Sequence, residues 1–210
     1  MPAGDTGHPS PADRANLGPV PEHALKEWAV TIAALAAGDQ VLIVRKGGIG
    51  EKKFELPHPR FHLFPTYAHQ RPELVKPEAR ERFADPLAQR EDPAHLPLAV
   101  YAELHAAHPI ADPEALAAID HLHVLTSEYA AERLKWRRIH PLWAAVLRVW
   151  TLPSPPVLEV GPEHGGCVSW IDLPESIGPP AERVPALSDE DFATSAAAVE
   201  SALTSAGVIS

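Results

Sequence analysis

One stretch, 41–66, constrains the fold of this chain more than any other part of it. It opens with four consecutive aliphatic residues, typical of a buried strand, which run directly into Arg45 and Lys46. The glycine-rich sequence GGIG follows at 47–50, and the return segment 54–65 alternates aromatic or aliphatic residues with His, Arg and Pro. The stretch therefore predicts a buried strand that leads into a mobile loop, with polar groups gathered beside it.

The order of the expected elements favours the α+β class. The run WAVTIAAL at 28–35 is compatible with a strand that forms a hairpin with 41–46, although its alanines also allow a helix. Further strands are expected at 61–64, 98–105, 121–125, 142–152, 157–160 and 166–173, and helical segments at 22–26, 78–83, 112–119, from Thr126, and at 188–203. Without regular βαβ alternation, this order predicts a mainly antiparallel or mixed sheet with helices packed outside. A small closed barrel is one form that such a sheet can take.

Composition divides the chain into a central domain and two tails. Residues 1–21 contain almost no large apolar side chain and are expected to be disordered. A single α+β domain is expected at 22–173, a proline-rich linker at 174–187, and an acidic helix and tail at 188–210. The C-terminal helix is a candidate docking element for a protein partner.

The charge distribution directs attention to the opening stretch. The chain has a formal net charge of −10, yet residues 25–64 carry six Lys or Arg against four Asp or Glu. A local basic patch on an acidic protein decides what binds there. No apolar run is long enough for a membrane span, no export signal is seen, and the one cysteine, Cys167, cannot form an internal disulfide. These features predict a cytoplasmic protein without membrane association.

The glycine-rich loop matches no nucleotide-binding fingerprint, because neither GxxxxGK[ST] nor GxGxxG is present. Backbone N–H groups flanked by four cations would nevertheless suit a phosphate. The alternative is a flexible loop with solvated lysines.

A second basic segment, 133–138, interleaves cations with an indole. Arg133 and Arg137 share a helical face, while Trp136 is placed to dock inward. This pattern suits a phosphate backbone and a splayed base. It is equally the pattern of a core tryptophan at a solvated cationic helix end.

Two enzymatic alternatives remain open. Glu51 and Lys53 form the Glu-x-Lys element of Mg²⁺-dependent nucleases, without a convincing second carboxylate. His58 and His62 could contribute to a zinc site, although no HExxH or paired-cysteine pattern is present. We therefore expect neither a metal nor another cofactor, and we name no catalytic residue.

The candidate binding residues follow from the two basic segments and the return segment. The phosphate or anion candidates are Arg45, Lys46, Lys52, Lys53, His58, Arg60, His62, Arg133, Arg137 and Arg138. The candidate pocket aromatics are Phe61, Trp136 and Trp170. The return segment is expected to bring its His and Arg residues back beside Arg45 and Lys46.

Three pieces of the chain together carry a family resemblance. They are 25–30 (LKEWAV), 42–48 with FHLFPT at 61–66 and His69-Gln70, and 136–149 with GGCVSW at 165–170. In these motifs the chain resembles a bacterial family known as domain of unknown function 1802, over roughly residues 24–173. The resemblance implies a nucleic-acid context such as restriction or DNA defence, because members are sometimes joined to a restriction-type endonuclease domain. The expected barrel-like sheet is also similar to PUA-like modules that bind RNA or modified bases, which is analogy of fold alone.

Together these observations predict a domain that binds nucleic acid or a nucleotide rather than an enzyme. A metal-dependent hydrolase or nuclease and a non-catalytic protein-interaction module are the alternatives.

Overall fold

The computed structural model describes residues 22–46, 55–89, 91, 93–135, 142–166 and 168–209. The expected disordered tail at 1–21 lies outside this part. The strands are β1 (His23–Trp28), β2 (Leu42–Arg45), β3 (Arg60–Thr66), β4 (His95–Pro97), β5 (Val100–Ile110), β6 (Leu142–Thr151), β7 (Val157–Glu159), β8 (Trp170–Asp172) and β9 (Val184–Pro185). The helices are α2 (Ala29–Ala36), α3 (Pro77–Arg82), α4 (Ala84–Ala88), α5 (Pro113–Ala118), α6 (Ser127–Lys135) and α7 (Asp189–Ser205), with 3-10 turns η1 (Pro72–Leu74), η2 (Asp120–Leu122) and η3 (Pro162–His164).

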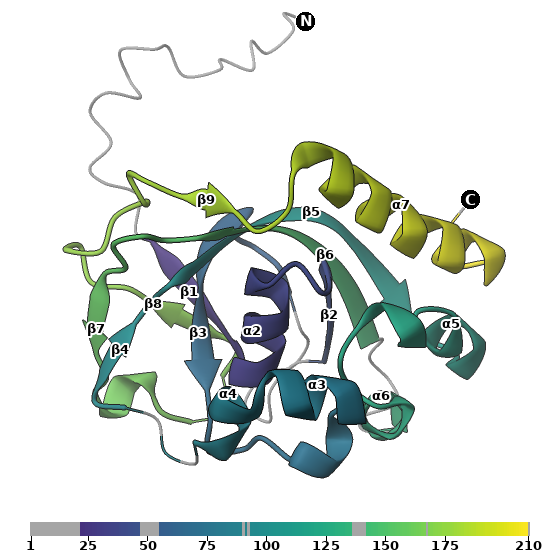
Figure 1. The fold of residues 1–210 in the computed structure, drawn as a ribbon, viewed down its shortest axis with the longest axis horizontal. Coiled ribbons are helices and arrows are strands. Elements are labelled where there is room, and N and C mark those ends of the chain that lie inside the picture. Colours follow the sequence, from purple (N-terminus) through teal and green to yellow (C-terminus); the bar gives the residue numbers. More distant parts are fainter. Residues whose placement is uncertain are drawn as a thin grey trace, which may run out of the picture.

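Within the described residues, seven strands form one mixed sheet in the order β2-β6-β5-β3-β1-β8, with β9 also paired to β6 (Figure 1). Only β1 and β3 run parallel; the other neighbours in this sheet are antiparallel. The antiparallel pair β5 and β6 forms its longest ladder, with a register shift between Leu104 and Ala106. A separate pair, β4 and β7, covers apolar residues of β1, β3 and β8. The structure confirms the predicted α+β class with a mixed sheet.

The sheet curls without closing into a barrel. Its concave side buries Leu25, Ile43, Phe61 and Leu147 together with Ile32 of α2, so that α2 fills the curve (Figure 1). The end strands β2 and β8 have no backbone pairing with each other among the described residues. The closed barrel that we expected as one form of the sheet is therefore wrong. We call the gap between the end strands β2 and β8 the seam, and side chains rather than backbone hydrogen bonds cross it.

Two expectations near the N-terminus are also wrong. Residues 22–26 belong mostly to β1 rather than to a helical turn, because β1 pairs in parallel with β3, far along the chain. The run 29–36 is the helix α2 and not one arm of a hairpin. Most residues of α2 are buried. A helix that is apolar on all sides lacks the hydrophobic periodicity that would distinguish it in the sequence from a buried strand.

Elements with local start signals are confirmed. Asp112 caps α5, its Oδ1 accepting the Ala115 N–H at 2.8 Å, and Ser188 caps α7. The strand expected at 142–152 is β6. By contrast, 121–125 forms the end of η2 and a single bridge from Leu125 to Val75 rather than a strand, and only Trp170–Asp172 of 166–173 is a strand.

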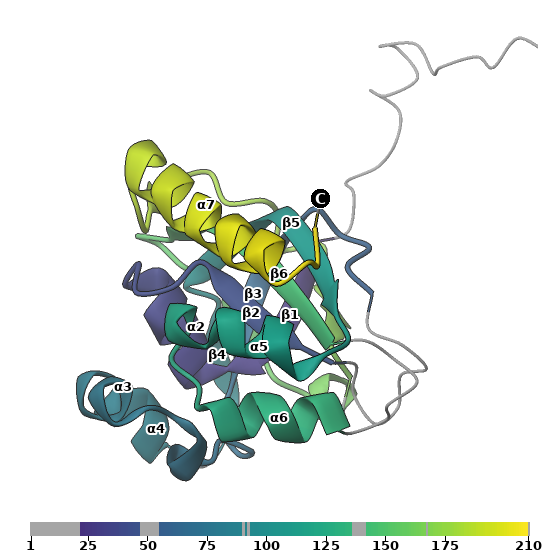
Figure 2. The same cartoon turned by 90° about the vertical axis from the view of Figure 1, so that its right-hand side faces the viewer.

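Helices α7, α5 and α6 lie one below another, in this order from the top of Figure 2, against the sheet. Ala196, Val199 and Leu203 of α7 are buried in a cluster with residues of β2, β6 and α5. The apolar face of the C-terminal helix is therefore covered by the chain itself. No helix in the described ranges has the length and apolarity that crossing a bilayer requires.

Candidate functional site

Arg45, at the end of β2, spans the seam of the curled sheet. Its Nη1 donates to the Lys26 carbonyl at 2.6 Å and lies 3.2 Å from Oε2 of Glu27, while its Nη2 donates to Oγ of Ser169 at 2.9 Å. Strand alternation turns Glu27 to the same side as Leu25, and Arg45 to the same side as Ile43. The two charges therefore meet at the end of the concave core, with side-chain exposures of 15% for Arg45 and 4% for Glu27.

The contacts of Glu27 and Lys26 complete this polar arrangement. Oε1 of Glu27 accepts the backbone N–H of Trp28 at 2.7 Å. The Lys26 ammonium, on the other face of β1, donates to the carbonyls of His164 and Gly166, the latter at 3.2 Å. We call Lys26, Glu27, Arg45, Tyr129 and Ser169 the Arg45 cluster. All but Arg45 are buried.

Tyr129 connects the Arg45 cluster to α6. Its ring lies 5.0 Å from that of Trp28, and the guanidinium of Arg133 lies 5.2 Å from its centroid. Burial raises the pKa of Tyr129, the positive charge of Arg133 opposes that rise, and Glu27 adds to it. Arg133 is thus held at the edge of the cluster by the tyrosine.

Lys46, which follows β2, also reaches α6. It is buried, and its Nζ donates to the carbonyl of Leu134 at 3.2 Å. Burial lowers the pKa of Lys46. The carbonyls at the C-terminal end of a helix favour a cation. This contact joins the residue that follows β2 to the C-terminal end of α6. We call Arg45, Lys46 and Arg133 the basic corner.

Arg60 and His62 of the return segment do not point toward the basic corner. Phe61 and Leu63 face the concave core, so the alternating residues Arg60 and His62 lie on the other face of β3. Arg60 is exposed and pairs with Glu103 at 3.3 Å. His62 is fully buried; its ring meets that of Tyr101 at 4.9 Å, edge to face, and burial lowers its pKa. The expectation that these residues return beside Arg45 and Lys46 is therefore wrong.

His58, Phe61 and Trp170 form a separate group of rings with His23. The imidazoles of His58 and His23 are stacked with centroids 3.5 Å apart. The Trp170 ring meets those of His58 at 4.9 Å and Phe61 at 5.0 Å, edge to face in both cases. Asp172 accepts a hydrogen bond from His23 Nδ1 at 2.9 Å when that nitrogen is protonated.

Several predicted residues lie outside the described part of the chain. They are Lys52, Lys53, Trp136, Arg137 and Arg138 of the binding candidates, and Glu51 of the nuclease alternative. Within the described ranges, no group of three or more His, Cys, Asp or Glu side chains is arranged to hold a metal ion. His58 and His62, the zinc candidates, have different ring neighbours.

Sequence reasoning missed Lys26, Glu27, Tyr129, Ser169 and His23. One signal was available: Lys26 and Glu27 are adjacent charges flanked by Leu25 and Trp28. On a strand, such a pair puts one charge on each face, and a charge on a buried face requires a partner.

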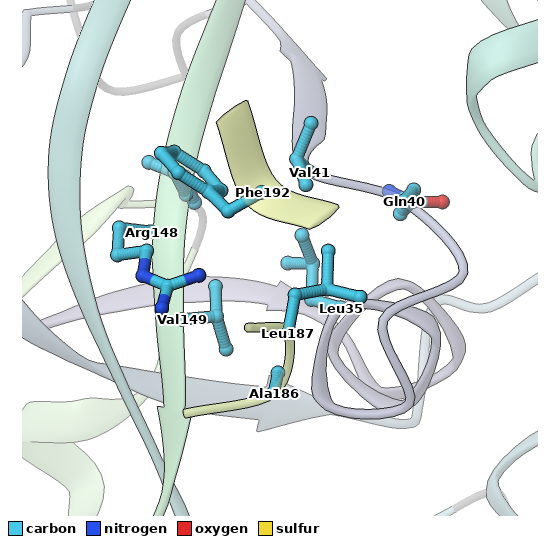
Figure 3. Close-up of a pocket in the computed structure, with 9 residues that line it drawn as sticks. Leu35, Gln40, Val41, Arg148, Val149, Ala186, Leu187 and Phe192 are labelled. Carbon is cyan, nitrogen blue, oxygen red and sulfur yellow. The ribbon is translucent and has the colours of Figure 1, made fainter. Parts of the chain in front are cut away.

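A small pocket lies away from these residues, where β2 and β9 share one edge of β6 (Figure 3). Its free volume of about 10 Å³ accommodates roughly one water molecule. The lining residues are Leu35, Gln40, Val41, Leu147, Arg148, Val149, Ala186, Leu187 and Phe192. None of the predicted site residues lines it, and its size excludes a nucleotide.

Fold and site together define an α+β protein with a curled mixed sheet, whose seam is spanned by a buried ion pair next to a basic corner. The chain belongs to the family described as "Domain of unknown function (DUF1802)", whose sequence profile matches residues 24–198. The match confirms the resemblance noted in the sequence and extends into α7. No curated protein and no solved structure gave a significant match.

Proposed function

We propose that this protein binds a polyanion, nucleic acid or a nucleotide, at the basic corner. The observation that carries the proposal is the contact between Lys46 Nζ and the Leu134 carbonyl, at 3.2 Å. In the sequence, segment 47–54 follows Lys46 directly and segment 136–141 follows shortly after Leu134, and each segment contains two further cations. Clustered cations on an acidic protein attract phosphate by local field, whatever the net charge.

The structure of the corner suggests a division of roles. Arg45 and Lys46 bond to groups of the protein itself, so we assign them the role of framing the corner. We assign the phosphate contacts to Lys52, Lys53, Arg137 and Arg138. The nucleic-acid context that the family resemblance implies agrees with this assignment, and so does the tryptophan among these cations at 136.

Fluorescence anisotropy with labelled single-stranded DNA, duplex DNA and RNA at low salt tests the proposal. The double variants Lys52→Glu/Lys53→Glu and Arg137→Glu/Arg138→Glu should each weaken binding. For every phosphate that the variant no longer neutralises, the slope of log affinity against log salt should become shallower by about 0.7–0.9. Competition by mononucleotides separates recognition of a nucleotide from recognition of a strand.

The matched control is Arg80→Glu/Arg82→Glu on α3, which changes the net charge equally. Arg80 and Arg82 are exposed, and Arg82 pairs with Asp39 at 2.8 Å. An exposed pair of this kind contributes at most about 1 kcal/mol to stability. The proposal fails if the wild type binds none of the probes at low salt, or if the control variant weakens binding as much as the corner variants.

A further inference from the structure

Segment 55–59, which leads into β3, is attached to the sheet mainly by side chains. Two of its five residues are prolines, which have no N–H to donate. Trp170 Nε1 donates to the Glu55 carbonyl at 2.9 Å, and the Leu104 N–H donates to the Pro59 carbonyl at 2.9 Å. Between these two points, the ring of His58 lies on His23 and against the edge of Trp170.

We propose that the stacked imidazoles of His23 and His58 form a pH-sensitive latch, which holds segment 55–59 on β1 and β8 at neutral pH and releases it in mild acid. At a centroid distance of 3.5 Å, one positive ring stacks well on a neutral ring. Two positive rings at that distance repel each other. Docking therefore tolerates one proton on the pair and opposes the second.

The charged groups around the pair determine which proton is opposed. His23 faces the carboxylates of Asp172, at 2.9 Å, and Glu22, its neighbour in sequence. His58 faces His23 and, more weakly, Asp172. Burial lowers the pKa of His58, the charge of His23 lowers it further, and Asp172 opposes both. His23 thus has carboxylates beside it, whereas a proton on His58 is opposed by burial and by the charge of His23.

The pH range in which the latch opens follows from the direction in which docking shifts the pKa of His58. The pKa of His58 is lower when docked than its ordinary value of 6.5, so docking is strongest above pH 6.5 and weakens as the pH falls below it. Each pKa unit of lowering corresponds to a tenfold change in the docking equilibrium. We therefore expect docking to weaken between pH 7.5 and pH 5.

Hydrogen exchange of the Trp170 Nε1–H and the Leu104 N–H, which donate to the Glu55 and Pro59 carbonyls, measures the latch by NMR in the full chain. After correction for the intrinsic pH dependence of exchange, protection of these two groups should fall from pH 7.5 to pH 5. His58→Phe keeps a flat ring that cannot take up a proton, and should make protection independent of pH. The control His69→Phe removes an exposed histidine elsewhere and should behave as wild type.

A second variant keeps the test decisive if His58→Phe disturbs folding. Asp172→Asn removes a carboxylate that balances positive charge on the His23–His58 pair. Protection should therefore fall by a larger factor than in the wild type over the same pH range. Unchanged protection of the Trp170 Nε1–H and the Leu104 N–H in the wild type between pH 7.5 and pH 5 overturns the latch. An equal loss of protection in wild type and His58→Phe overturns it as well.

Discussion

His123 is a buried histidine whose protonation should determine how the protein responds to acid. It lies between η2 and the Leu125 bridge and is 5% exposed. Burial lowers its pKa to about 4 from an ordinary 6.5, the nearby Lys76 ammonium adds to the effect, and Asp120 opposes it. In the folded protein this imidazole is therefore neutral at pH values where the unfolded chain binds a proton.

The size and sign of the effect follow by linkage. The imidazole of His123 has a lower pKa in the folded protein than in the unfolded chain. Its contribution to stability is therefore complete above pH 6.5 and is lost as the pH falls toward 4. At 1.36 kcal/mol per pKa unit, the full loss is about 3 kcal/mol, of which about 2 kcal/mol appears by pH 5. A loss of this size is a large part of the 5–15 kcal/mol that stabilises an ordinary domain.

Urea denaturation at pH 7.5, 6 and 5 of the wild type and of His123→Leu measures this contribution. Leucine has a similar volume and cannot bind a proton, so the variant should lose about 2 kcal/mol less than the wild type between pH 7.5 and pH 5. Other acid-sensitive groups, His58 and His62 among them, are common to both proteins and cancel in the difference. His69→Leu serves as the exposed-histidine control. Parallel stability curves for the wild type and His123→Leu would refute the reasoning.

Three further changes test the packing that positions the site, each by urea denaturation at neutral pH. Glu27→Gln leaves the charge of Arg45 buried without its carboxylate and should cost about 3–5 kcal/mol, so a loss below 1 kcal/mol would show that the pair is well hydrated. Gly38→Ala should cost about 1–3 kcal/mol, because φ is +75° there and a Cβ would lie 2.7 Å from Leu187, and a neutral result would contradict that backbone conformation. Ser188→Ala removes the cap of α7 and should cost about 1 kcal/mol, whereas no change would mean that the helix end does not need the hydroxyl.

The candidate site was predictable only in part. A basic patch around Arg45 and Lys46 follows from local charge counting, and the structure adds Arg133 to it through Tyr129 and the α6 carboxyl end. The return segment was assigned to the same patch because it is close in sequence. In the fold, however, Arg60 and His62 lie on the opposite face of the sheet from Arg45, and which face is buried depends on how the strands pair across the whole chain.

The sequence alone determined the features that depend only on residues close together in the chain. The caps of α5 and α7, the apolar run of β6 and the basic character of the stretch after β2 each depend on neighbouring residues, so they could be identified without a fold. Only the tertiary structure decided that 23–28 is a strand and 29–36 a helix, because β1 forms by pairing with β3 and the alanine-rich run is buried on all sides. It also decided the contact of Arg45 with Glu27 and Ser169, and the stack of His23 on His58. These contacts join residues far apart in the chain, and the burial that makes them energetically important exists only once the sheet has curled.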